Sequence, residues 1–447
     1  MSQTLLGLVA RQGLGAVLYW VAQGVLPLGR LGRAAARPLL AAVVWLEPSH
    51  QKARAYYDYL QALRIFPRGE TEEALMLLRR AHRAVPDDET LHLDWAVALT
   101  MANQYERAID VLEQLDSGEQ ARTELQFWTA LGWSYLRTGR FPAAEAAAKQ
   151  ASEYGVASSE LRLIRSLALA AEEGWVNKDG IAQVVNKQPK TLGMLLEFTY
   201  YIASIGKRTE AEDLLAALPA DNRPHAWRIV TQHSLSADDI ETAQWSLQKL
   251  GQLAPDSVDE LMMGCEIALR RGQMAEAVDK AHRAVAAQPD ELAVLETAGR
   301  VMVLAGQREE AFRYMTSALA EGSRDALAGG VVALYMLAQD RLDDARSVFR
   351  VQRSGDELAC LYAHTATAEV LKAEDDLAEA GALAQQAWEF WDEMPQWART
   401  EAVRQDIVSS LTEIAQVVVD TDNKPASQDA EQLLCRLREV ASAPDTH

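Results

Sequence analysis

The fold of this chain is decided by residues 128–151, which read WTALGWSYLRTGRFPAAEAAAKQA. Trp128, Leu131 and Tyr135 follow one another at i, i+3 and i+7, so they share one face of a helix. Gly132 lies on the same stripe, where the missing side chain lets a second helix approach closely. A glycine four residues after Tyr135 ends the first helix, and small alanines keep the second helix thin. The stretch predicts a helical hairpin whose apolar face must be covered by a neighbouring hairpin.

The same plan recurs along most of the chain. A small residue stands where each second helix would cross the first, at steps of 34, 36, 67, 32, 34, 34, 34 and 35 residues. These residues are Ala74, Ala108, Ala144, Ala211, Ala243, Ala277, Ala311, Ala345 and Ala380. Residues that tolerate tight turns stand five places before most of them: Gly69, Asn103, Gly139, Gly206, Asp238, Gly272, Gly306 and Asp340. The step of 67 spans one degenerate unit that lacks its alanine.

The spacing W-x2-L-G-x2-Y from Trp128 to Tyr135, followed by Gly139 and Ala144, resembles the tetratricopeptide repeat, a helix–turn–helix unit of about 34 residues. The resemblance extends over residues 55–394. It implies an all-α, right-handed superhelical solenoid of about nine to ten hairpins, with the degenerate unit near residues 158–191.

The resemblance and the composition together predict four segments. Residues 1–50 form an apolar and basic N-terminal segment, residues 55–394 the solenoid, residues 395–441 a C-terminal helical cap, and residues 442–447 a frayed tail. Within the cap we expect a helix that begins after Trp397 and runs to about Val419, a polar loop from Asp420 to Gln428 and a last helix from Asp429 to Ala441. Trp388, Phe390, Trp391 and Trp397 form an aromatic cluster that we expect to pack, at least in part, against this cap.

In this architecture the first helices line a concave groove, with inward places at the second, fifth, ninth and twelfth residues of each unit. These places are aromatic and apolar in the N-terminal half, which is typical of an interaction surface. The predicted groove residues are Tyr56, Tyr59, Leu63, Phe66, Leu93, Val97, Trp133, Leu136, Leu196 and Tyr200. In later units the places turn polar, with His225, Arg228, Gln232, Glu266, Glu296 and Arg300. The alternative is that the chain itself covers the apolar places, for example with residues 3–46.

Residues 1–46 carry four arginines and no acidic residue. Four interpretations stay open. The segment binds a membrane interface through Trp20, Arg30, Arg33, Arg37 and Trp45. It caps the first repeat or fills the groove. It crosses or re-enters a membrane, although glutamines and glycines interrupt its apolar run. It is a cleaved signal peptide, although it has no clear cleavage site.

Charge and motifs exclude several classes of function. The net charge of −20 argues against a protein that binds the nucleic-acid backbone in general, so no nucleic-acid partner is predicted. The three cysteines, Cys265, Cys360 and Cys435, are far apart and indicate reduced core thiols in a cytoplasmic chain. Phosphate-binding loops, nucleotide-binding glycine motifs, zinc-protease motifs and nucleophile elbows are missing from the sequence. We therefore predict no catalytic site, no cofactor and no metal.

The sequence favours a non-catalytic scaffold or adaptor that holds an apolar or amphipathic segment of another protein in its groove, in a bacterial-type cytoplasm. The alternative is a membrane-attached assembly or secretion factor on the cytoplasmic face of the inner membrane. In that case residues 1–46 anchor the chain and the repeats recruit clients. Partner identity and oligomeric state do not follow from the sequence.

Overall fold

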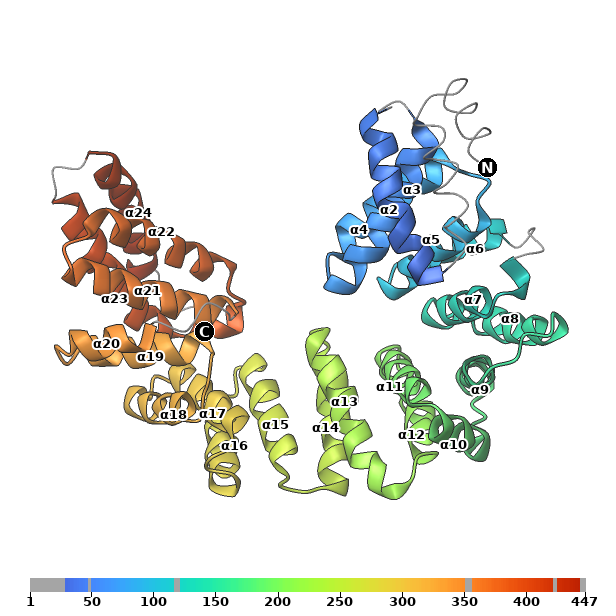
Figure 1. Cartoon of the computed structure of the whole chain (residues 1–447). Coiled ribbons are helices and arrows are strands. Elements are labelled where there is room, and N and C mark those ends of the chain that lie inside the picture. Colours follow the sequence, from blue (N-terminus) through green and yellow to red (C-terminus); the bar gives the residue numbers. More distant parts are fainter. Residues whose placement is uncertain (1–28, 47–49, 116–120, 350–355, 421–423, 443–447) are drawn as a thin grey trace. The chain divides into compact units, whose positions relative to one another are not determined.

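The computed structural model describes residues 29–46, 50–115, 121–349, 356–420 and 424–442 (Figure 1). All described elements are helices, which confirms the predicted all-α solenoid. The chain divides into two compact units, Met1–Ala220 and Asp221–His447. Because the boundary falls between two hairpins, each unit is a stack of whole hairpins and is described by itself.

The described residues of the first unit form five hairpins, preceded by α2 (Gly29–Leu46). They are α3 (Gln51–Ile65) with α4 (Thr71–Ala84), α5 (Glu89–Met101) with α6 (Tyr105–Leu115), α7 (Leu125–Arg137) with α8 (Phe141–Glu153), α9 (Ser159–Glu173) with α10 (Lys178–Lys187), and α11 (Pro189–Ser204) with α12 (Arg208–Ala216). Each first helix also packs on the second helix of the preceding hairpin, so the stack buries one continuous core.

The second unit contains five further hairpins and two closing helices. The hairpins are α13 (Arg223–Ser236) with α14 (Ile240–Leu253), α15 (Val258–Arg270) with α16 (Met274–Ala287), α17 (Leu292–Leu304) with α18 (Arg308–Ala320), α19 (Ala326–Leu337) with α20 (Leu342–Phe349), and α21 (Glu357–Ala373) with α22 (Leu377–Glu393). The short helix η5 (Gln396–Ala398), α23 (Glu401–Val419) and α24 (Lys424–Ser442) follow.

The predicted turns and crossings are confirmed residue by residue. All nine crossing alanines are buried, with at most 1% of their surface exposed. All eight predicted turn residues adopt a positive φ, between 56° and 90°. Glycine, asparagine and aspartate reach this left-handed region at lower cost than other residues, and that is why only these three types occupy the turns.

Several helix starts follow from capping side chains. Asp88, Ser158, Asp239 and Ser257 each accept a hydrogen bond from a backbone N–H in the first turn of the helix that follows. Such a cap satisfies one of the N–H groups that a helix leaves unpaired. Side-chain caps therefore mark the starts of the hairpins that begin with α5, α9 and α15, and left-handed residues mark the predicted turns.

The helix α2 packs on α3 through Ala36, Leu40 and Val43, each fully buried. This portion of the N-terminal segment therefore covers the exposed end of the first hairpin. Arg37 on the same helix is half-buried. Trp20 lies outside the described residues, as do the side chains of Arg30, Arg33 and Trp45. Among the described helices, none has both the length and the hydropathy needed to cross a membrane.

The C-terminal prediction is correct for α23 and wrong for the start of α24. The last helix begins at Lys424, inside the predicted polar loop, five residues before Asp429. Pro425 is compatible with this start because the first turn of a helix needs no N–H from it. Trp388 and Trp391 are buried, with nearly parallel rings 6.3 Å apart, and they join the same core as α23 and α24, as predicted.

The cysteine prediction is partly wrong. All three thiols are free, and Cys265 is fully buried, where burial raises its pKa to about 12. Cys360 is half-buried, and Cys435 is exposed on α24, so it is not a core thiol.

Two glycines test the packing of the second unit. A Cβ at Gly330 of α19 would lie 2.6 Å from the carbonyl carbon of Tyr362 in α21. We expect Gly330→Ala to lower the free energy of unfolding by about 2–3 kcal/mol, because backbone cannot move aside as a side chain can. At Gly251 of α14 the nearest atom would be Glu260 Cγ at 3.7 Å, so Gly251→Ala should raise stability by about 0.5 kcal/mol. Urea unfolding of both variants measures the contrast, and an unchanged Gly330→Ala variant would contradict the close approach of α19 and α21.

Candidate functional site

The ten predicted groove residues divide evenly by burial. Five are buried inside the first unit, with Tyr59 only 6% exposed and Trp133 only 8%. The buried five are Tyr59, Leu93, Trp133, Leu136 and Leu196. The half-buried five are Tyr56, Leu63, Phe66, Val97 and Tyr200. In this conformation the buried side chains serve packing between helices, and only the half-buried ones present surface to a partner.

Two tyrosine hydroxyls join adjacent first helices. The Tyr56 hydroxyl donates to Asp88 Oδ2 at 2.6 Å, and the Tyr59 hydroxyl donates to Asp94 Oδ2 at 2.6 Å. The acceptors stand 32 and 35 residues after the tyrosines, about one repeat further along the chain. That repeat-length spacing is a signal in the sequence. It indicates that these aromatic rings lie between helices and do not simply line an open surface.

Arg137 of α7 connects helices that are far apart in the sequence. Its guanidinium lies 5.2 Å from the ring centre of Tyr105 in α6 and 5.0 Å from that of Tyr201 in α11. It also pairs with Glu197 of α11 at 3.0 Å. Burial raises the pKa of Tyr105 to about 12 and raises that of Tyr201, so both phenols stay neutral. This cluster fixes α6 and α7 against α11, past the degenerate hairpin between them.

The second unit carries a hollow of about 830 Å³ on three consecutive first helices, α13, α15 and α17. We call it the second-unit hollow. Its lining residues at inward places of the repeat are Arg228, Gln232, Leu235, Asp259, Met262, Glu266, Leu269, Ala293 and Arg300. These are nine of the twelve inward places on these helices, and five of the nine are charged or amide side chains. His225, Glu296 and Val303 do not line the hollow; the Glu296 carboxylate accepts a hydrogen bond from the Ser323 hydroxyl instead.

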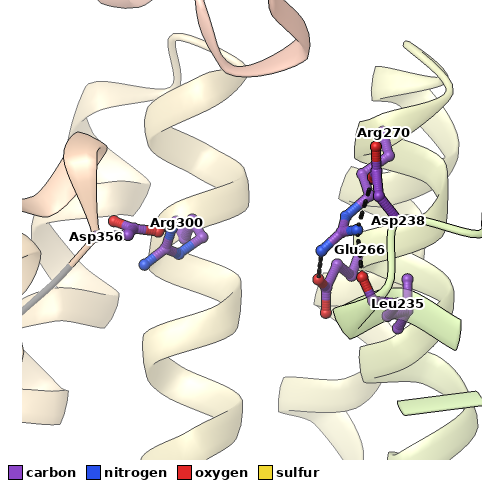
Figure 2. Close-up of polar contacts among 6 residues, drawn as sticks. All are labelled: Leu235, Asp238, Glu266, Arg270, Arg300 and Asp356. Carbon is purple, nitrogen blue, oxygen red and sulfur yellow. Dashed lines mark hydrogen bonds and ion pairs between the residues drawn. The ribbon is translucent and has the colours of Figure 1, made fainter. Parts of the chain in front are cut away.

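Each first helix contributes one arginine to the hollow, and each arginine has a carboxylate partner. Arg228 of α13 faces Asp259 of α15 at 3.8 Å. Arg300 of α17 pairs with Asp356, the residue that caps α21 (Figure 2). These carboxylates hold the guanidiniums in place, so the hollow presents ordered ion pairs and carries no large excess of positive charge.

The Arg270 side chain is the most constrained of the three, with only 16% of it exposed. It pairs with Asp238 at 3.0 Å and with Glu266 one helical turn earlier on α15. It also donates to the carbonyl oxygen of Leu235, near the end of α13, at 2.6 Å (Figure 2). The ring of Trp397 lies 5.9 Å away, within the range of a cation–π contact. Arg270 thereby links α13, the turn at Asp238, α15 and η5.

The chain's own C-terminal segment contributes one side chain, Trp397 of η5, to the lining of the hollow. The helix η5 contacts α15, and α23 contacts α17 and α21. Asp406 of α23 pairs with Arg308 of α18 and accepts a hydrogen bond from the Tyr362 hydroxyl at 3.3 Å. Burial raises the pKa of both Asp406 and Tyr362. The first helices beyond α15 are therefore partly covered from within, a placement that the sequence did not reveal.

The second-unit hollow is suited to binding. Its lining residues include no histidine and no cysteine, and its three guanidiniums are already paired. Met262, Met263 and Trp397 add apolar surface beside these ion pairs. Within the described ranges, no three His, Cys, Asp or Glu side chains are grouped so that they could hold a metal ion.

Comparison with known proteins gives one family and several distant folds. The family model for the tetratricopeptide repeat matches residues 68–126. No curated protein matches the sequence.

The structure is similar to several solved structures at low scores. The Cut9–Hcn1 hetero-tetramer of the APC/C is 13% identical, with 98% of this chain and 99% of that chain covered at a TM-score of 0.34. PilF from Pseudomonas aeruginosa is 17% identical, with 49% and 94% covered at 0.35. Yeast Tom70 is 10% identical, with 86% and 96% covered at 0.30. At these TM-scores the similarities carry no argument about what the chain does.

Arg270 is expected to stabilise the second unit far more than an exposed arginine does. Arg270→Met removes the bond to the Leu235 carbonyl and both ion pairs, and it should cost about 1–3 kcal/mol of unfolding free energy. Arg283→Met is the matched control, because Arg283 pairs with Asp256 and Asp279 at the surface, and it should cost less than about 1 kcal/mol. Denaturant midpoints of the two variants give the comparison. Equal losses would mean that Arg270 is no more than a surface ion pair.

Proposed function

We propose that this chain is a non-catalytic scaffold that binds a segment of another protein in the second-unit hollow, because the tetratricopeptide-repeat family model matches residues 68–126 and helical hairpins recur along the described chain. Repeat proteins of this kind bind other proteins along the surface that their stacked helices create. The observation that carries the proposal is that the first helices of three successive hairpins line one hollow of about 830 Å³ with residues from inward repeat positions.

The chemistry of the hollow supports an amphipathic partner segment. Met262, Met263 and Trp397 offer flexible and aromatic apolar surface, which adapts to different side chains. The arginine–carboxylate pairs beside them offer donors and acceptors to the partner's polar groups. A hollow of this volume lies within the range of about 300–1,000 Å³ that is usual for binding pockets, so it accommodates a short stretch of a longer segment.

The first unit offers a second surface that a protein partner could contact. Tyr56, Leu63, Phe66, Val97 and Tyr200 keep part of their surface exposed. We propose that these five, and not their buried neighbours, are the groove residues of the first unit that meet a partner.

A substitution pair tests the hollow. Ala293 of α17 lines the hollow and is exposed, whereas Ala275 of α16 is exposed and does not line it. Ala293→Arg should fill part of the hollow and reduce the recovery of groove partners in affinity purification about tenfold, which corresponds to about 1.4 kcal/mol. Ala275→Arg adds the same side chain elsewhere and should leave recovery unchanged. If both variants retain the same proteins as the wild type, with unchanged circular dichroism, the hollow does not bind them.

A second candidate function uses the N-terminal segment. Residues 1–46 contain four arginines and no acidic residue, in a chain whose net charge is −20. This contrast supports a cytoplasmic protein attached to an anionic membrane surface through Trp20, Arg30, Arg33, Arg37 and Trp45, with the repeats recruiting clients. Each arginine near such a surface contributes about 1 kcal/mol to the free energy of membrane binding.

Vesicle flotation tests this attachment without removing α2, which covers the first hairpin. The triple variant Arg30→Gln, Arg33→Gln, Arg37→Gln should lose flotation with vesicles that contain phosphatidylserine. The control variant Lys52→Gln, Arg79→Gln, Arg83→Gln removes three exposed cations of α3 and α4 and should still float. Wild-type protein that stays at the bottom of the gradient would rule out membrane attachment and leave the scaffold proposal standing.

A further inference from the structure

The degenerate hairpin α9–α10 encloses a pocket of about 360 Å³ between its two helices. We call it the α9–α10 wedge. Arg162 and Arg165 line it from α9, and Lys187 lines it from α10. None of its lining residues, all in the described part of the chain, carries a carboxylate. In a chain with a net charge of −20, the wedge is a local reversal of sign.

The wedge has a cause in the sequence. The degenerate hairpin can be compared with the regular hairpin α7–α8 by counting from the N-cap of each first helix. The N-cap is Glu124 for α7 and Ser158 for α9, and the places compared are the fourth, seventh, eighth and eleventh after it. In α7 these places hold Trp128, Leu131, Gly132 and Tyr135. In α9 they hold Arg162, Arg165, Ser166 and Leu169, and all four line the wedge. The face that a first helix normally buries on its second helix is cationic here, so burial no longer drives α10 onto it.

The second helix changes at the matching position. Ala144 stands four places after Arg140, the N-cap of α8, and the same count from Asn177, the N-cap of α10, reaches Ile181, a larger side chain that is fully buried. Lys178 pairs with Asp213 of α12 at 2.8 Å, and α10 packs on α11 and α12 as well as on α9. Both facing surfaces of the hairpin are thus altered. The regular hairpin α7–α8 also has a pocket of about 330 Å³ beside Leu131 and Tyr135, but its lining, made of described residues, contains the acidic Glu113 and no cation, so positive charge is what sets the wedge apart.

The cations at the wedge are available to a ligand. Arg165 makes a solvent-exposed ion pair with Glu145 of α8 at 3.3 Å, and such pairs exchange at little cost. Arg162 donates a long hydrogen bond, 3.4 Å, to the Ser159 hydroxyl. Lys187 is exposed on the last turn of α10. An anionic group could therefore approach all three charges without breaking a buried interaction.

The wedge also offers apolar surface. Trp175, in the link between the two helices, is 55% exposed, although a tryptophan is usually mostly buried. Leu169 and Val184 line the pocket from α9 and α10. An indole beside arginines suits an apolar or aromatic side chain flanked by negative charges, because the ring receives the apolar part and the cations receive the charges.

From these observations we infer that the α9–α10 wedge binds an acidic segment of a partner protein, in which carboxylate side chains flank an apolar or aromatic residue. The inference shares with the proposed function only the premise that partners are proteins. It concerns a different surface, formed by the inside of one opened hairpin in the first unit. Loss of one site therefore leaves the other intact.

Fluorescence anisotropy of the full chain tests the inference directly. The probe is a short fluorescein-labelled peptide in which glutamates flank one phenylalanine, and the reference is the same peptide with glutamines. We expect the acidic peptide to bind, the glutamine peptide not to bind, and added salt to weaken binding, because screening acts on exposed charges. No binding of the acidic peptide at low ionic strength would overturn the inference.

Variants locate the binding on the molecule. Arg162→Gln with Lys187→Gln should weaken it about tenfold, and Trp175→Ala should weaken it while Trp175→Phe retains most of it. Lys52→Gln with Arg79→Gln removes two exposed cations of the first unit away from the wedge and should change affinity less than twofold, about 0.4 kcal/mol. Equal weakening by both double variants would show general charge attraction and overturn the site.

Two further experiments distinguish peptide binding at the wedge from binding at the second-unit hollow and from binding of other anions. Ala293→Arg should leave peptide binding unchanged, so a failed second-unit hollow and a failed wedge give different results. ATP and inorganic phosphate serve as competitors. Tight binding of either one at the wedge, with no binding of the acidic peptide, would assign the wedge to a phosphate ligand and overturn the inference.

Discussion

The structure depends on how closely two helical backbones approach within each hairpin. At every predicted crossing the second helix carries a buried alanine, and turn residues with positive φ bring the chain back on itself. Neighbouring hairpins also approach closely: a methyl group at Gly330 of α19 would meet the backbone of α21, the first helix of the next hairpin. Such crossings let each hairpin bury its apolar stripe on its neighbours, which is the main favourable contribution to folding.

The same constraint explains why the hairpin α9–α10 differs from the regular repeat. A hairpin needs apolar or small residues on both facing surfaces. Because α9 carries Arg162 and Arg165 at these places, α10 does not pack closely on this face of α9, and a pocket lies between the two helices. Neighbouring hairpins supply the missing restraint, since Arg137, Glu197 and Tyr105 tie α7 and α6 to α11 beyond the opened pair. A solenoid tolerates such a defect because each repeat is stabilised mainly by its immediate neighbours.

Much of the fold could be predicted because repeat positions fix local geometry. The alanine and turn positions located the hairpins, since every predicted crossing alanine is buried and every predicted turn residue has a positive φ. Longer-range placement could not be predicted. No period in the sequence shows that α23 covers α17 and α21, or that the last helix begins at Lys424, since these depend on contacts the chain makes only once.

The candidate sites show a limit of interpreting inward repeat positions by their apolarity. Tyr59 and Trp133 occupy such positions, yet burial and the bond from Tyr59 to Asp94 use them inside the chain. An apolar side chain on the inner face stabilises the fold when it packs on the next helix, so it is often buried inside the chain and does not reach a partner. A charged side chain gains little from burial and stays at the surface. In a stacked-helix protein, polar inward positions such as Arg228 and Arg300 are therefore better indicators of a surface left for partners.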